Sequence, residues 1–197
     1  MKSLRYFVEF IIIKLLFFIF YFIGFVNSSK LGSFIGVNLG PLFRNKKIIE
    51  QNLQLSRIGK DYNERKKIVK NMWGNYGRIF AEYPHIKNFR NDKLSKYLVI
   101  NGQDVLNKII EKKKKVIFVS GHFNNFELMA MHIEKSGVNL AAIYRPLNNF
   151  FLNKTMEDIR RSYICKKQIK KGKSGVREII NLLNDNYSIA LMIDQRV

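Results

Sequence analysis

The chain is poor in cysteine and histidine, and each shortage excludes a class of site. Its 197 residues include one cysteine, Cys165, which excludes an intrachain disulfide framework and a cysteine-rich metal site. The three histidines, His85, His122 and His132, include no pair at the i, i+4 spacing of a helical zinc site. No internal repeat is apparent, and the length suffices for one domain with a substantial core.

Acidic residues are also scarce, because 15 Asp and Glu stand against 35 Lys and Arg, a formal net charge of +20. This excess favours an anionic partner, which could be nucleic acid, a membrane surface or an acidic substrate. Charge alone most often indicates nucleic acid, but the apolar N-terminus favours a membrane, so we expect no nucleic-acid partner. The lysines at 112–115 fit either a solvated helix end or a contact with the membrane surface.

The longest apolar stretch covers residues 7–26 and is interrupted only by Glu9 and Lys14. The part from Phe10 onward, which includes Lys14, is close to the minimum of roughly 17 residues for a membrane-spanning helix. The Asn-Ser-Ser that follows is a poor signal-peptide cleavage site, which favours an uncleaved anchor. Lys14 could snorkel from a tilted or interfacial helix, so the sequence leaves open whether the anchor spans the bilayer or lies at its surface.

After the anchor, apolar runs alternate with helical patterns, which is typical of an α/β fold. The patterns predict strands at 116–120, 139–144, near 168–169 and at 188–193, and helices at 48–55, 62–83, 104–113, 149–161 and 174–183, with a further helix after His122 that ends at Gly137. Ser174 is the expected N-cap of the last helix. Right-handed crossovers would then give a mostly parallel sheet with helices on both faces.

The remaining segments receive simpler assignments. Residues 27–45 contain glycine and serine and are predicted to be a connector, with a short amphipathic segment as the alternative, and His85 is expected to be a loop residue. We divide the chain into a membrane-anchor helix at 1–30 and an α/β domain at 31–197.

The residues suited to chemistry follow the 116–120 strand. A short apolar run ends there in Ser-Gly, followed by His122 and, five positions later, by Glu127. Open α/β sheets bind ligands at the carboxyl ends of their strands. We expect Glu127 to hold one imidazole nitrogen of His122 and leave the other free to accept a proton. The spacing fits equally well a histidine that caps a helix beside a solvent-facing glutamate.

Five segments resemble, in the same order, motifs of one protein family. They are KIIEQNL at 47–53, NYGRIFAEY at 75–83, GHFNNFE at 121–127, IYRPLNN at 143–149 and ALMIDQ at 190–195. The chain is thus similar to the lipid A biosynthesis acyltransferases, the lauroyl and myristoyl transferases of the HX4D/E glycerolipid acyltransferase superfamily. One departure is the pair Asn124-Asn125, where the family has glycine-asparagine.

The resemblance implies that a fatty acyl group passes from the thioester of an acyl carrier protein to a hydroxyl of a lipid A precursor. His122 would be the general base, and Glu127 would orient the imidazole and stabilise its charge. No metal or tightly bound cofactor is required for this reaction.

Further residues, in and beyond these motifs, are candidates for substrate binding. Arg145 and either Arg160 or Arg161 would stabilise the oxyanion of the transition state or bind a phosphorylated sugar. Arg145 could equally be a plain surface arginine. Asn125 belongs to this set, as does Asp194, which is expected to hold an arginine.

The resemblance also implies a location in the bacterial inner membrane, with the catalytic face toward the cytoplasm, where acyl carrier protein resides. Both this acidic protein and an anionic glycolipid would complement the basic chain. The family has more sheet and helix after the position of Val197, so we expect a C-terminally incomplete domain. Two alternatives stay open: a superfamily acyltransferase for a lysophospholipid or another glycolipid, and a non-enzymatic, basic, membrane-associated binding module.

Overall fold

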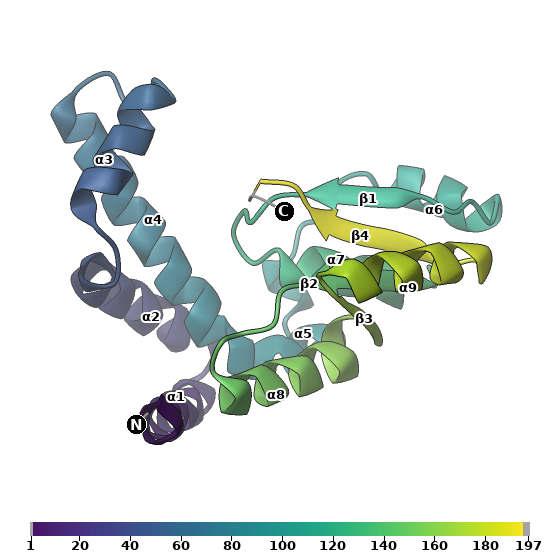
Figure 1. Cartoon of the computed structure of the whole chain (residues 1–197), viewed down its shortest axis with the longest axis horizontal. Helices are drawn as coiled ribbons and strands as arrows, with labels where there is room; N and C mark the ends of the chain where they lie inside the picture. Colours follow the sequence, from purple (N-terminus) through teal and green to yellow (C-terminus); the bar gives the residue numbers. More distant parts are fainter. Residues whose placement is uncertain (1, 195–197) are drawn as a thin grey trace. The chain divides into compact units, whose positions relative to one another are not determined.

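The computed structural model describes residues 2–194 and separates the chain into two compact units (Figure 1). Ile13–His85 form a helical unit, and the residues up to Ile12 together with those from Ile86 onward form a sheet-bearing unit. The domain boundary predicted after residue 30 falls inside helix α2 (Phe25–Leu39), which lies wholly within the helical unit.

Helices make up the described part of the first unit. It contains the later turns of α1 (Lys2–Ile23), then α2, the 3-10 turn η1 (Gly40–Leu42), α3 (Lys46–Leu55), α4 (Tyr62–Glu82) and the 3-10 turn η2 (Tyr83–His85). The predicted apolar N-terminal helix is thereby confirmed. By length and composition α1 could cross a membrane, and its spanning or interfacial pose stays a prediction.

Helices α2 and α4 pack with their backbones in contact because glycines line the surface between them. A Cβ atom added to Gly32 or to Gly77 would meet the carbonyl oxygen of the other, and one added to Gly36 would meet the carbonyl oxygen of Trp73. Small residues permit this close approach. The prediction of a connector at 27–45 was wrong, since the glycines that suggested a loop are the contact surface of a helix.

His85 is 3% exposed and sits at the break between α1 and α2, so its assignment as a loop residue was also wrong. Gly24, with a φ of 79°, separates the two helices. Near this break, the Nε2 atom of His85 lies 3.1 Å from the carbonyl oxygen of Phe20 and 3.1 Å from the hydroxyl of Ser28. Burial lowers the pKa of His85, which favours the neutral imidazole.

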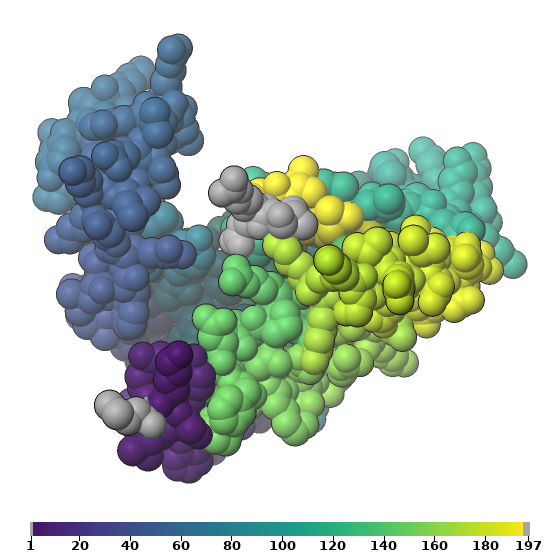
Figure 2. Space-filling model, in the orientation of Figure 1, coloured from purple at the N-terminus to yellow at the C-terminus, as the bar shows by residue number. Residues whose placement is uncertain are grey.

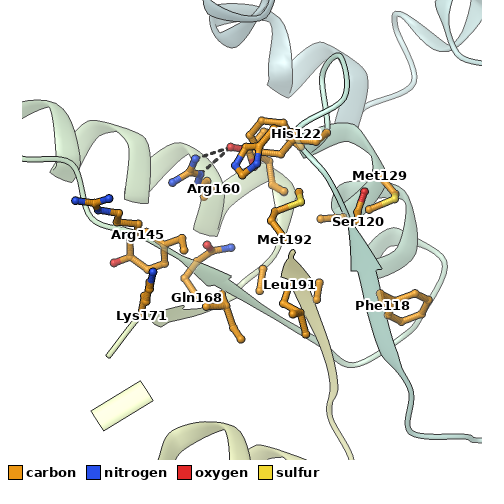
Figure 3. Close-up of a pocket in the computed structure, with 18 residues that line it drawn as sticks. Phe118, Ser120, His122, Met129, Arg145, Arg160, Gln168, Lys171, Leu191 and Met192 are labelled. Atoms are coloured by element: carbon orange, nitrogen blue, oxygen red, sulfur yellow. Dashed lines mark hydrogen bonds and ion pairs between the residues drawn. The ribbon is translucent and has the colours of Figure 1, made fainter. Parts of the chain in front are cut away.

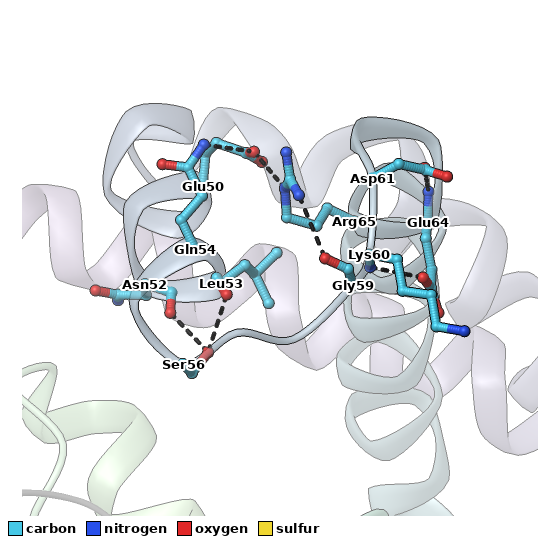
Figure 4. A network of polar contacts seen from close by, with 10 residues as sticks. All are labelled: Glu50, Asn52, Leu53, Gln54, Ser56, Gly59, Lys60, Asp61, Glu64 and Arg65. Carbon is cyan, nitrogen blue, oxygen red and sulfur yellow. Dashed lines mark hydrogen bonds and ion pairs between the residues drawn. The ribbon is translucent and has the colours of Figure 1, made fainter.

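Polar contacts hold the corner between α3 and α4 (Figure 4). Asp61 N-caps α4 by accepting a hydrogen bond from the backbone of Glu64 at 2.8 Å, and the Glu64 carboxylate accepts one from the backbone of Lys60 at 2.7 Å. Arg65 then donates its Nε–H to Glu50 at 2.6 Å, which ties α4 to α3.

The second unit is an α/β fold, as predicted. Its described strands are β1 (Ile117–Ser120), β2 (Leu140–Tyr144), β3 (Lys167–Lys170) and β4 (Ser188–Met192), all parallel, in the order β1-β4-β2-β3. Its helical elements are α5 (Ile86–Arg90), η3 (Ser95–Tyr97), α6 (Gln103–Glu111), α7 (Glu127–Lys135), α8 (Phe150–Ile159), the π-helical turn η4 (Arg160–Ile164) and α9 (Lys173–Asn184). The predicted cap was wrong, because Gly172 precedes α9 as its N-cap and no side chain caps it.

The two faces of the sheet meet different helices. Ala141, Ile169 and Ile189 pack against Leu182 of α9 in a buried apolar cluster. The crossovers from β1 to β2 and from β2 to β3 run in one direction along the sheet, whereas the crossover to β4 returns. Right-handed connections therefore place α7 and α8 on the face opposite α9. In Figure 2, α8 and α9 form much of the visible surface of this unit.

The first turns of α1 pack on the start of α8 within the sheet-bearing unit. Asn149 N-caps α8 through its Oδ1 and donates its Nδ2–H groups to the Tyr6 carbonyl at 2.9 Å and to Glu9 at 3.0 Å. The rings of Phe7 and Phe151 meet edge to face, with their centroids 5.6 Å apart. The beginning of the predicted anchor is thus also part of this folded unit.

Candidate active site

The pairing of β1 with β4 brings two distant loops to one edge of the sheet. Ser120 lies opposite Met192, and the backbone N–H of Ile193 donates to the Ser120 carbonyl at 3.0 Å. Because the strands are parallel, the loops that follow them begin side by side. These loops carry His122 and Asp194.

His122 and Asp194 make two hydrogen bonds. The backbone N–H of His122 donates to Asp194 Oδ2 at 2.8 Å, and its Nδ1 lies 2.8 Å from Asp194 Oδ1. A carboxylate only accepts, so Nδ1 bears the proton in this contact, and the lone pair of a neutral imidazole is then on Nε2. The backbone bond, then the side-chain bond, lower the pKa of Asp194 below its ordinary value.

Glu127, the first residue of α7, forms a different pair from the one predicted. Its Oε1 accepts hydrogen bonds from Arg160 Nε at 2.8 Å and from Arg160 Nη2 at 2.6 Å. Sequence analysis paired Glu127 with His122 and Asp194 with an arginine, whereas the structure gives the imidazole to Asp194 and the arginine to Glu127. The physical reason is strand order, which places the end of β4 directly beside the loop of His122.

The structure also distinguishes the two arginine candidates in η4. The side chain of Arg160 is 16% exposed, and its guanidinium carbon lies 5.8 Å from the centre of the Tyr144 ring. Arg161 is exposed. The Tyr144 hydroxyl donates to Glu157, which also accepts a hydrogen bond from Asn153 at 2.7 Å. Burial, followed by this contact with Glu157, raises the pKa of Tyr144.

A cavity of about 260 Å³ lies beside His122, between the sheet and the elements α7 and η4 (Figure 3). Its apolar lining includes Phe118, Met129, Ala142, Ile164, Leu191 and Met192, and its polar lining includes His122, Arg145, Arg160, Gln168 and Lys171. Apolar walls with a few polar groups suit an amphiphilic ligand whose reacting end is polar.

The remaining predicted residues occupy separate positions. Arg145 follows β2, is exposed and lines the cavity, and within residues 2–194 no ion pair to it is observed. Asn125 lies in the loop before α7, outside the lining of the cavity, as does Arg161. Gln195, which follows Asp194 in its motif, lies outside the described residues. Sequence analysis missed Gln168 and Lys171. Lys171 directly follows β3, so strand-end position could have indicated it, whereas Gln168 lies within the strand and had no such signal.

The neighbouring Asn124 accounts for the departure from the family motif. It has a φ of 45°, in the left-handed region. Glycine adopts this conformation without steric cost and asparagine tolerates it better than most residues. Asparagine is therefore a workable substitute at the position where the family has glycine.

His132 and Cys165, two other side chains with reactive groups, do not form a second site. His132 Nε2 lies 2.7 Å from Gln103 Oε1, and His132 is outside the lining of the cavity. The thiol of Cys165 is buried, and burial raises its pKa to about 11, so it is a poor nucleophile. Among the described residues, no group of three or more His, Cys, Asp and Glu side chains could hold a metal ion. The absence of a metal or cofactor stays a prediction.

The fold and the site together define a parallel α/β protein with a histidine–carboxylate pair at adjacent strand ends, beside a largely apolar cavity. The model of the bacterial lipid A biosynthesis acyltransferase family matches residues 1–197, and the chain belongs to this family. Its membership makes the protein an acyltransferase with a lipid-like substrate. No curated protein and no solved structure matches the chain.

Proposed function

We propose that the protein transfers a fatty acyl group from the thioester of an acyl carrier protein to a hydroxyl of a lipid A precursor. Family membership supports acyl transfer in lipid A biosynthesis. The observation that carries the finer proposal is the 2.8 Å contact between His122 Nδ1 and Asp194 Oδ1 at the edge of a largely apolar cavity. Asp194 replaces Glu127 as the proposed orienting carboxylate.

His122 acts as the general base in this mechanism. Asp194 holds the proton on Nδ1, so Nε2 accepts the proton of the acceptor hydroxyl as its oxygen attacks the thioester carbonyl. The tetrahedral intermediate then collapses, the carbon–sulfur bond breaks, and the carrier thiolate receives the proton from the imidazolium. The Asp194 carboxylate stabilises the imidazolium while it exists.

The two arginines of the cavity, Arg145 and Arg160, have different electrostatic roles in this mechanism. Arg160 is a fixed cation, since Glu127 and the ring of Tyr144 hold its guanidinium in the cavity wall. A fixed cation stabilises charge that develops on a reacting oxygen without reorganising first. Arg145, exposed at the end of β2, is placed to bind a phosphate of the anionic glycolipid.

The location follows from the substrates. The apolar helix α1 would keep the protein at the bacterial inner membrane, where the glycolipid is embedded. The catalytic face would be cytoplasmic, because acyl carrier protein is found there. The net charge of +20 suits both this acidic carrier and an anionic membrane surface. Nucleic acid has no role in this proposal.

The test is acyl transfer by the full chain in isolated membranes, with a radiolabelled acyl group on acyl carrier protein. Label should appear in a lipid A precursor and depend on His122, while His132→Ala serves as the matched control and keeps activity. Label in a lysophospholipid instead would identify a different acceptor. Binding of anionic lipid without any transfer would contradict the proposal and favour a binding module.

A further inference from the structure

Gln168 is a buried polar side chain that the mechanism does not use. It is 5% exposed and lies in β3 opposite Ala142 of β2. Arg145 and Lys171 follow the ends of these strands, so Gln168 is further from the charged rim than they are. It lines the cavity, and Figure 3 shows its carboxamide pointing from the strand toward the side on which Arg160 lies.

The orientation of the Gln168 carboxamide is determined by its surroundings. Its Nε2 donates to the carbonyl oxygen of Cys165 at 2.8 Å, and since a carbonyl only accepts, the nitrogen must face it. Cys165 is itself held, because its Sγ–H donates to the Leu140 carbonyl at 3.0 Å and its N–H to the Arg160 carbonyl at 2.9 Å. The other end of the carboxamide, Oε1, is therefore held in a defined direction.

Oε1 is an acceptor available to a ligand. Within residues 2–194 no side chain or backbone group donates a hydrogen bond to it. Ala142 lies opposite Gln168 on β2 and Ala190 lies opposite Ala142 on β4, and both line the cavity with Ile164, so this part of the wall is apolar. An acyl chain of methylene groups packed over this oxygen would leave it buried and unpaired, whereas a chain bearing a hydroxyl at that point would donate to it.

We propose that Gln168 is a specificity-determining residue, which accepts a hydrogen bond from a hydroxyl on the acyl chain in the cavity and so favours hydroxylated over unsubstituted chains of equal length. This rests on the proposed function insofar as it takes the occupant of the cavity to be a fatty acyl chain. The preference arises because a polar group built into a site discriminates against ligands that leave it unpaired.

Equilibrium binding tests the proposal independently of catalysis. The full chain in detergent micelles would be titrated with free fatty acids of one length, either unsubstituted or carrying a single hydroxyl at successive carbons. At one hydroxyl position the affinity should exceed that of the unsubstituted acid by roughly tenfold. Equal affinities for the whole set would overturn the proposal, and this comparison needs no variant.

Two variants test whether a preference for hydroxylated fatty acids depends on Gln168. Gln168→Leu and Gln168→Met both remove the acceptor, and each should bring the ratio of the two affinities to about one. Thermal unfolding shows whether each variant is folded. If one of the two is unfolded, the affinity ratio is measured in the other. Ile164→Val is the matched control, since it changes the shape of the same wall and should change both affinities by the same factor. A preference that survives in folded Gln168 variants would contradict the assignment.

The experiment also separates this inference from the proposed function. In a His122→Ala background, binding of the hydroxylated chain and its dependence on Gln168 should persist although transfer is lost. Discrimination in binding without transfer by the parent protein would overturn the proposed function alone. Transfer by the parent with equal rates and equal affinities for both chain types would overturn the role of Gln168 alone.

Discussion

The two units use a histidine in opposite ways. In the helical unit, His85 is almost wholly buried and lies against a backbone carbonyl and a serine hydroxyl at a helix break. In the sheet-bearing unit, the side chain of His122 is 28% exposed, and a carboxylate holds one of its nitrogens at the mouth of a cavity. Exposure and the type of partner, rather than residue type, decide which histidine can take part in chemistry.

The helical unit and the candidate active site also depend on different kinds of contact. The helical unit brings its helices together through glycines, so its stability depends on the absence of side chains at the contact of α2 with α4. The candidate active site depends on side chains from separate strand ends that meet through sheet pairing. Substitutions should therefore affect folding in the first region and catalysis in the second.

The largest expected effect is on catalysis. His122→Ala should lower kcat/KM for acyl transfer by a factor of roughly 10² to 10⁴, because general-base assistance is lost. Steady-state kinetics in membranes, with protein content measured by immunoblot, checks this, and His132→Ala should keep near-parent activity. Near-parent transfer by the His122 variant would mean that the base lies elsewhere.

The next effect is on folding of the helical unit. Gly77→Ala would force a methyl group against the backbone of α2, and overpacking of this kind lowers the free energy of unfolding by roughly 1–3 kcal/mol. Chemical denaturation in micelles measures it. Asn71→Ala, at an exposed position on the same helix, should change stability by less than about 0.5 kcal/mol. Equal stability of the two variants would contradict the close contact.

Sequence patterns predicted much of the sheet-bearing unit because local signals determine it. Apolar runs of strand length bounded by helical patterns gave the strands and their parallel arrangement, now confirmed. The position of His122 after β1 followed from the same reasoning. The family resemblance then indicated Arg145 and either Arg160 or Arg161, of which Arg145 and Arg160 line the cavity and Arg161 does not.

The partners of these residues could not be predicted, since they depend on strand order. Nothing local reveals that β4 inserts between β1 and β2, which is what delivers Asp194 to His122. The glycines of α2 led to the wrong prediction of a connector for a similar reason. Glycine locally favours loops, and it permits close helix packing only when a second helix is present. His85 likewise gained its role from the break at Gly24.

A smaller effect is expected at the rim of the cavity. Arg145→Ala should raise KM for a phosphorylated acceptor by about tenfold or less while kcat changes little, because an exposed cation contributes to binding and is screened by salt. KM measured over a range of ionic strength should also depend less on salt in this variant. A loss confined to kcat would instead place Arg145 at the reacting carbonyl.

The smallest effect concerns pH and the helical unit. The pKa of folded His85 lies below the ordinary value of 6.5, so the folded chain binds fewer protons than the unfolded chain. The associated stability is present above pH 6.5 and is lost as pH falls from there toward the folded pKa. Denaturation midpoints across this window should decline in the parent and decline less in His85→Asn. An equal decline in both would assign the pH dependence to other groups.

The central claim is that Asp194, rather than Glu127, orients His122. Nitrogen-15 NMR of histidine-labelled protein in micelles, at a pH where the imidazole is neutral, reports the tautomer directly. The account predicts the Nδ1–H tautomer for His122 in the parent and in Glu127→Gln, and its loss in Asp194→Ala. Loss of that tautomer in Glu127→Gln and its retention in Asp194→Ala would contradict the account.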